Sequence, residues 1–157
     1  MTTFDARPQA AIGARPPGWL SSSLADGHAV DHDAVHPFRD AATSDPGSVS
    51  EARRFVDRTL TGWGADRVVF DAQLVVSELV TNAMRHGGGA AQLRLLCQGR
   101  ELACVVSDHS RSVPVATVAD VYAEFGRGLR LIEALCSAWG WFSPAGRDKL
   151  VWAVLIA

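Results

Sequence analysis

The chain has 157 residues, of which 48% are hydrophobic and 20% charged, and its net charge is -2. This length and balance fit one globular domain with a full hydrophobic core. The slightly negative net charge excludes a protein that binds nucleic acid mainly through a basic surface. No apolar run is long enough for a membrane span or a signal-peptide core. We therefore expect a cytoplasmic protein without a membrane or a direct nucleic-acid partner.

Three cysteines lie in apolar stretches and form no CxxC pair; they are Cys97, Cys104 and Cys136. Free cysteine is among the most frequently buried residue types. We expect reduced side chains in the core rather than metal ligands or disulfide partners.

The segment from Met1 to about Val35 differs from the rest of the chain, because proline, glycine and serine interrupt every apolar pair. Such a segment buries too little surface to offset its ordering entropy, so residues 1–35 are expected to be a disordered extension. Trp19 and Leu20 leave one alternative open, a short docking element.

Three histidines in this region recur at a spacing of four, His28, His32 and His36. On a helix they would align and could bind a metal. Gly27 and Pro37 disfavour a helix here, so no metal site is expected.

An extended segment is expected over residues 36–42, and Ser44 to Gly47 form a break. Ser48 then opens a helix, because Glu51 stands at the capping-box spacing. Its apolar residues recur at helical period; they are Val49, Ala52, Phe55, Val56 and Leu60. This helix is expected to end at Gly62–Gly64.

A second helix is expected over residues 66–86, with apolar residues on more than one face, as for a helix packed between layers. Gly87 to Gly89 can provide its C-cap. Two β-runs follow, 91–98 and 101–107, joined by a hairpin turn at Gly99-Arg100.

Residues 109–125 lack a period and contain Pro114, which indicates a loop. A third helix follows Gly126-Arg127-Gly128, and its apolar stripe comprises Leu129, Ile132, Leu135, Cys136 and Trp139. Two further β-runs are expected, 140–143 and 150–156. The order β-α-α-β-β-loop-α-β-β predicts an α/β fold, a two-layer α/β sandwich with a mostly antiparallel sheet and its helices on one face, over residues 36–157.

Glu78 and Asn82 are the first candidate site residues. They stand four apart, so a helix places them on one face, among apolar neighbours where an unpaired carboxylate is costly. An Asn oxygen suits Mg²⁺, and a glutamate one turn away can deprotonate a hydroxyl. A solvated stripe is the alternative.

Asp108 directly follows an apolar strand, where it can form a turn or accept a hydrogen bond from the exocyclic amine of adenine. Gly126-Arg127-Gly128-Leu129 lie at the start of a helix, where backbone N–H groups can approach a phosphate. A plain turn and a solvated Arg127 are the alternatives there.

The stretch SELVTNAMRHG resembles the N-box of the GHKL ATPases. Together with VVSDHS, GRGLRLIEAL and KLVWAVL, it is most similar to the anti-sigma-factor serine kinase group of that superfamily. The resemblance covers residues 36–157 and implies a Bergerat-type sandwich that binds ATP and Mg²⁺.

The resemblance also implies a role for each matching residue. Glu78 would be the catalytic base, Asn82 the Mg²⁺ ligand and Asp108 the adenine-binding carboxylate. Gly126 and Gly128 would form the phosphate loop, and residues 109–125 the ATP lid. Three residues at the end of the N-box would line the nucleotide pocket: Arg85, His86 and Gly87.

Two positions depart from the family pattern: Ser110 replaces a usual glycine, and Leu150 stands where many relatives have a threonine near the adenine. These departures concern nucleotide affinity more than the fold, and the short lid predicts weak or partner-dependent ATP binding.

By resemblance, the leading hypothesis is a serine kinase acting on an anti-sigma factor antagonist, with a sigma factor as a second partner and a homodimer as the expected assembly. The alternatives are a non-catalytic module that sequesters such a partner, and a small ATP hydrolase.

Overall fold

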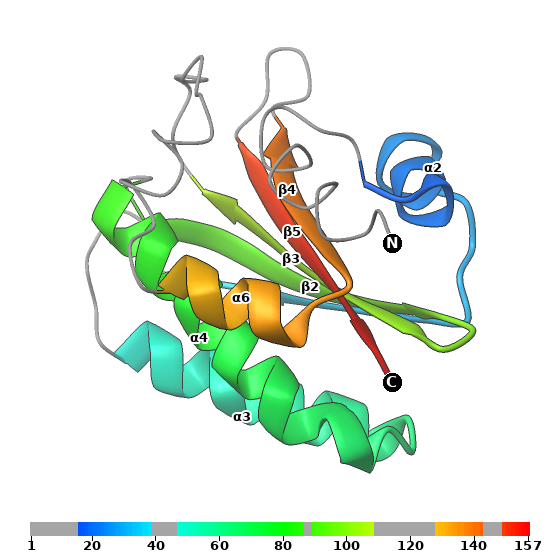
Figure 1. Ribbon diagram of the computed structural model, residues 1–157, viewed down its shortest axis with the longest axis horizontal. Helices are drawn as coiled ribbons and strands as arrows, with labels where there is room; N and C mark the ends of the chain where they lie inside the picture. The colour runs from blue at the N-terminus through cyan, green and yellow to red at the C-terminus, as the bar shows by residue number, and fades with distance from the viewer. Residues whose placement is uncertain (1–15, 39–46, 87–88, 109–127, 143–148) are drawn as a thin grey trace.

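The computed structural model describes residues 16–38, 47–86, 89–108, 128–142 and 149–157 (Figure 1). The elements, in chain order, are α2 (Gly18–Asp26), β1 (His32–Pro37), α3 (Gly47–Gly62), the 3-10 turn η1 (Asp66–Val68), α4 (Val69–His86), β2 (Ala90–Gln98), β3 (Glu101–Asp108), α6 (Gly128–Leu135), β4 (Ala138–Phe142) and β5 (Leu150–Ile156).

The five strands form one sheet in the order β1-β2-β3-β5-β4, and each neighbouring pair is antiparallel. Helices α3, α4 and α6 lie together on one face of this sheet (Figure 1). The predicted α/β two-layer sandwich is therefore confirmed. β3 is the central strand, and it pairs with β5 in the register Cys104↔Ala153.

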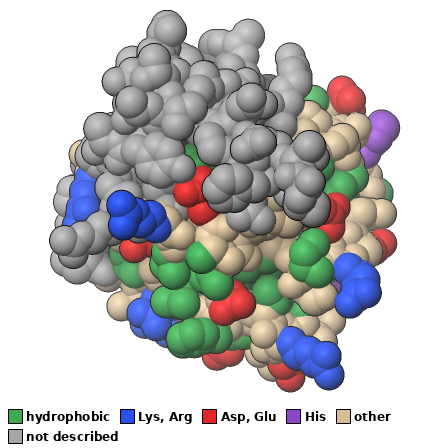
Figure 2. Space-filling view, in the orientation of Figure 1, with side chains coloured by type: hydrophobic (Ala, Val, Ile, Leu, Met, Phe, Trp, Pro, Cys, Tyr) green, Lys and Arg blue, Asp and Glu red, His purple; other side chains and the backbone are tan. Residues whose placement is uncertain are grey.

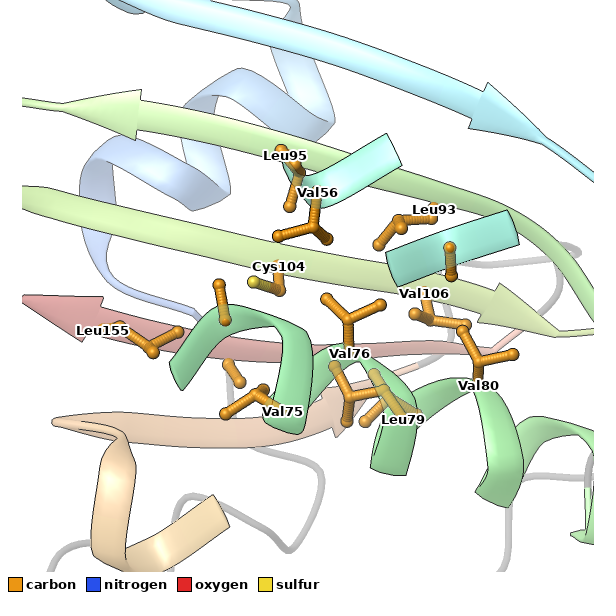
Figure 3. Close-up of a cluster of buried hydrophobic side chains, with 14 of the residues drawn as sticks. Val56, Val75, Val76, Leu79, Val80, Leu93, Leu95, Cys104, Val106 and Leu155 are labelled. Carbon is orange, nitrogen blue, oxygen red and sulfur yellow. The ribbon is translucent and has the colours of Figure 1, made fainter. Parts of the chain in front are cut away.

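The main core fills the space between the sheet and the helix layer. Side chains alternate along β3, so Cys104 and Val106 face the helices whereas Ala103 and Val105 face the other way. From α4, four aliphatic side chains project toward the strands (Figure 3); they are Val75, Val76, Leu79 and Val80. Burial raises the pKa of the Cys104 thiol above its ordinary range, and the nearby Cys136 raises it further. All three cysteines are buried, and no disulfide joins them.

The predicted apolar stripe of the first helix is confirmed, since Ala52, Phe55, Val56 and Leu60 of α3 are buried. Glu51 lies in the first part of this helix, which begins at Gly47, and its carboxylate accepts a hydrogen bond from His36 Nε2 at 2.5 Å. Glu51, the predicted capping-box residue, therefore links α3 to the edge strand β1 through this hydrogen bond.

The N-terminal region differs from the prediction. Disorder was expected through Val35, but α2 and β1 lie in this region, and residues 1–15 are outside the described part of the chain. Leu20 of α2 is fully buried against the sheet face opposite α3, α4 and α6, in a second cluster. This cluster comprises Leu20, Leu96, Ala103, Val105, Trp152 and Val154. The docking alternative for Trp19 and Leu20 is the one the structure supports.

β1 is held to its neighbour by an ion pair as well as by backbone bonds. Arg94 of β2 donates hydrogen bonds to both carboxylate oxygens of Asp33, at 2.9 and 2.6 Å. His32 of the same strand stacks on Trp63 with ring centroids 5.0 Å apart. In the described ranges, no group of three or more His, Cys, Asp or Glu side chains could hold a metal ion.

The C-terminal elements follow the prediction with one shift. α6 ends at Leu135, and Trp139, which was assigned to the stripe of this helix, lies in β4. The reason is that the Ser137 N–H donates a hydrogen bond to the Val154 carbonyl oxygen of β5 at 2.8 Å, so pairing with β5 begins two residues after the helix ends. None of the helices in the described residues is long and apolar enough to cross a membrane.

Candidate functional site

The C-terminal half of α4 carries Glu78 and Asn82 one turn apart. Glu78 is half-buried, and Asn82 is only 5% exposed. Within the described residues, the side-chain nitrogen Nδ2 of Asn82 has no hydrogen-bond partner. An unsatisfied buried polar group costs roughly 1–3 kcal/mol of stability and needs a physical explanation, of which a bound ligand is one.

Asp108 closes β3 on the side of the sheet that faces the helices, since it has the same parity as Val106. It is 2% exposed, and its Oδ2 lies 3.4 Å from the Nζ of Lys149, which is itself 4% exposed. The Asp108 backbone N–H also donates to the Lys149 carbonyl oxygen at 3.1 Å. A buried carboxylate with a buried cationic partner thus marks the end of β3.

The ends of α4 and β3 lie at the same end of the sheet. Gly89 ends the connection after α4 with a φ of 107°, a conformation that favours glycine. β2 starts at the next residue, Ala90, and Ala90 pairs with Asp108. Val80 and Val106 belong to the same core between these elements (Figure 3). The polar residues of α4 and β3 therefore border the same region between the helix layer and the sheet.

Lys149 is the residue of this site that the sequence prediction missed. Leu150 was chosen as the position beside the adenine, but its side chain packs against the second cluster, on the α2 face of the sheet. The strand alternates, so the preceding Lys149 faces the helices with Val151. The sequence does indicate this placement, because Lys149 stands two residues before Val151 and so shares the face of β5 that packs on the helices.

The other predicted site residues are placed only in part. Arg85 is exposed near the end of α4, and His86 is the last residue of that helix. Gly128 and Leu129 open α6, which packs beside α4. The remaining predicted positions lie outside the described residues: Gly87, Ser110, Gly126, Arg127 and the expected lid over residues 109–125.

The opposite end of the sheet has an open hollow of about 550 Å³. Its lining includes His32, Trp63 and Cys97, and none of the candidate site residues. The Asp31 carboxylate at its edge is already bonded to the Gly99 N–H at 2.8 Å. Size alone therefore does not make this hollow the functional site, since the buried polar groups lie elsewhere.

Charged side chains of both signs are scattered over the face shown in Figure 2 rather than gathered into one basic patch. Such a distribution agrees with the net charge of -2. It offers no continuous basic surface on the described part of this face for a nucleic-acid backbone.

Residues 42–150 match the family described as histidine kinase-like ATPase domain. The chain belongs to this family. The match agrees with the GHKL superfamily resemblance, and it spans α3, α4 and the strands that carry the buried polar groups. Membership makes ATP the expected nucleotide and ATPase- or kinase-type chemistry the expected reaction class. No curated protein matches the chain.

Proposed function

We propose that this histidine kinase-like ATPase domain is an Mg²⁺- and ATP-dependent serine kinase. Its substrate would be a serine of an anti-sigma factor antagonist, in partner-switching control of transcription, and a sigma factor would be its second binding partner. The observation that carries the proposal is the set of buried polar groups at one end of the sheet, with Asn82 on α4 and Asp108 on β3.

The chemistry of Asn82 fits a magnesium ligand. Its carboxamide is buried, and one end of it lacks a protein partner among the described residues. Rotation about χ2 exchanges the oxygen and nitrogen, and the oxygen is a ligand that Mg²⁺ accepts. When bound, the ion would supply charge neutralisation at the phosphates.

The nucleotide would lie between α4, the end of β3 and the start of α6. The Asp108 carboxylate would accept a hydrogen bond from the exocyclic amine of adenine. Backbone N–H groups at the start of α6, including Gly128, would approach the phosphates because a helix N-terminus favours anions. Arg85 and His86, with Gly87, Gly126, Arg127 and Leu129, would complete the pocket.

Glu78 would act on the protein substrate. Its carboxylate takes the proton of the attacking serine hydroxyl while that oxygen forms a bond to the γ-phosphorus. The bond between the γ-phosphorus and the β–γ bridging oxygen breaks, and ADP leaves with the electron pair. A positioned general base typically contributes about 10²–10⁴-fold to such a rate.

A second candidate function is a non-catalytic module that sequesters a sigma factor or an antagonist. One observation favours it: Asp108 is already paired with Lys149, so this part of the site is stable without a nucleotide. In this case ATP binding would be absent or would only support the fold.

The deciding experiment is incubation of the protein with labelled ATP, Mg²⁺ and candidate antagonist proteins from the same genome. Glu78→Gln should bind ATP normally and lose phosphoryl transfer, whereas Asp71→Asn, on the first turn of the same helix, should keep both. Phosphate release without an antagonist would indicate a hydrolase instead. A wild-type protein that does not bind Mg-ATP would refute the catalytic function and leave the sequestering module.

A further inference from the structure

The ion pair between Lys149 and Asp108 is buried at the end of β3, where the adenine would bind. We propose that Lys149 is a positioning residue that sets nucleotide specificity: it keeps Asp108 an anionic acceptor, so that the site binds a 6-amino purine and rejects a 6-oxo purine. This inference rests on the proposed role of Asp108 in binding adenine.

The first step of the argument is burial. The side chains of Lys149 and Asp108 are only 5% and 2% exposed, so neither charge is solvated by bulk water. A buried carboxylate without a cationic partner takes up a proton rather than remain charged. The ammonium 3.4 Å from Oδ2 opposes that protonation.

The second step is geometry. The Asp108 N–H bond to the Lys149 carbonyl oxygen, at 3.1 Å, fixes the two backbones side by side at the ends of β3 and β5. Both side chains project toward the helix layer, where Asn82 of α4 also lies buried. Because Lys149 approaches Oδ2, the carboxylate orientation is set before a base arrives.

The third step is hydrogen-bond chemistry. An ionised carboxylate only accepts hydrogen bonds, whereas a protonated one also donates through its O–H. The ionised form therefore complements the amine at position 6 of adenine and opposes the carbonyl oxygen of inosine or guanine. A protonated Asp108 would bind either base, and selectivity would decline.

The test compares the binding of ATP and inosine triphosphate to the full chain by calorimetry. Wild type should prefer ATP by about tenfold or more, since opposed acceptors leave both groups unsatisfied. In Lys149→Met, which removes the cation and keeps an unbranched side chain, the preference should fall below about threefold. Lys149→Arg, which retains the positive charge, should restore most of the preference.

Several outcomes would overturn the inference. A folded Lys149→Met that keeps the wild-type preference would show that the lysine has only a structural role, and so would a Lys149→Arg that loses it. If Lys149→Met does not fold, the double variant Asp108→Asn with Lys149→Met is used instead, because it removes both buried charges. The double variant should fold and show no preference for ATP. If the double variant also fails to fold, the preference of Lys149→Arg alone decides whether the inference holds. A wild type that binds neither nucleotide would refute the proposed function itself, whereas a retained preference in Lys149→Met refutes only the role of the lysine.

Discussion

Replacing Leu20 by alanine tests whether α2 stabilises the sheet. Leu20 is 0% exposed and contacts the cluster that includes Trp152 and Val154. Leu→Ala substitutions at buried sites cost about 2–5 kcal/mol, the lost transfer energy plus a cavity term. For a domain of this size, each kcal/mol lowers the melting temperature by about 2–4 °C, so a loss of about 3 kcal/mol corresponds to roughly 6–12 °C.

The observed loss has an upper limit. α2 is a short N-terminal helix of nine residues, so it can detach as a local unit once its main anchor is removed. The cost of Leu20→Ala then cannot exceed the free energy with which α2 docks. Deleting residues 1–27 measures that free energy directly, and it should lower the melting temperature and expose the apolar α2 face of the sheet.

The assay is thermal unfolding followed by circular dichroism, with Gly18→Ala as the matched control. Gly18 opens the same helix, and a Cβ there would meet nothing within 4 Å. Its substitution should be neutral or stabilising by about 0.4–1 kcal/mol, because alanine has less entropy to lose on folding. If Leu20→Ala changes the melting temperature no more than Gly18→Ala does, then α2 does not dock stably and the N-terminal region is disordered after all.

The remaining predictions concern the site and the core. Asp108→Asn should weaken ATP binding about 10–100-fold and lower the melting temperature, since a buried Lys149 without its carboxylate costs about 3–5 kcal/mol; unchanged affinity in calorimetry would contradict adenine binding by this residue. Glu78→Gln should reduce phosphoryl transfer about 10²–10⁴-fold with ATP affinity intact, and lost affinity would make Glu78 structural. Because burial raises the pKa of the Cys104 thiol, the unfolded chain loses this proton above about pH 8.5 while the folded chain keeps it. For this thiol the free energy of unfolding should then fall by about 1.4 kcal/mol per pH unit, so Cys104→Ala should reduce the slope in urea titrations, while Cys97, whose pKa burial also raises, keeps a smaller contribution. Leu150→Thr should cost about 1 kcal/mol through weaker packing on the α2 face and leave ATP affinity unchanged; a gain in affinity would show that the side chain reaches the nucleotide.

The elements with strong local patterns were predictable from the sequence. The stripe of α3 depends on residue spacing within one segment, and the hairpin β2-β3 on two apolar runs joined by the turn at Gly99-Arg100, so the positions of both follow from local signals. The boundary at Trp139 was not predictable in this way. Its apolar side chain fits the end of the helix stripe as well as β4, and a long-range bond to β5 decides between them.

The docking of α2 could have been inferred from the strands rather than from α2 itself. Residues 102–106 and 151–155 are apolar at consecutive positions, not at alternate ones. A strand that is apolar on both sides indicates a sheet covered on both faces. The three predicted helices cover only one face of the sheet, so a further element had to cover the opposite face. Trp19 and Leu20 were the apolar pair left over.

The candidate site was predictable to the level of motifs but not of register. Glu78, Asn82 and Asp108 stand at recognisable spacings, whereas the contact of Lys149 with Asp108 requires knowing which residues of β5 face the helices. A shift of one position reverses the face of every side chain on a strand. Leu150, the first residue of β5, contributes to the α2 cluster, whereas Lys149, directly before the strand, forms the buried ion pair on the helix face. The residue beside the carboxylate that would bind adenine is therefore Lys149, whose ammonium contacts Asp108, and not Leu150.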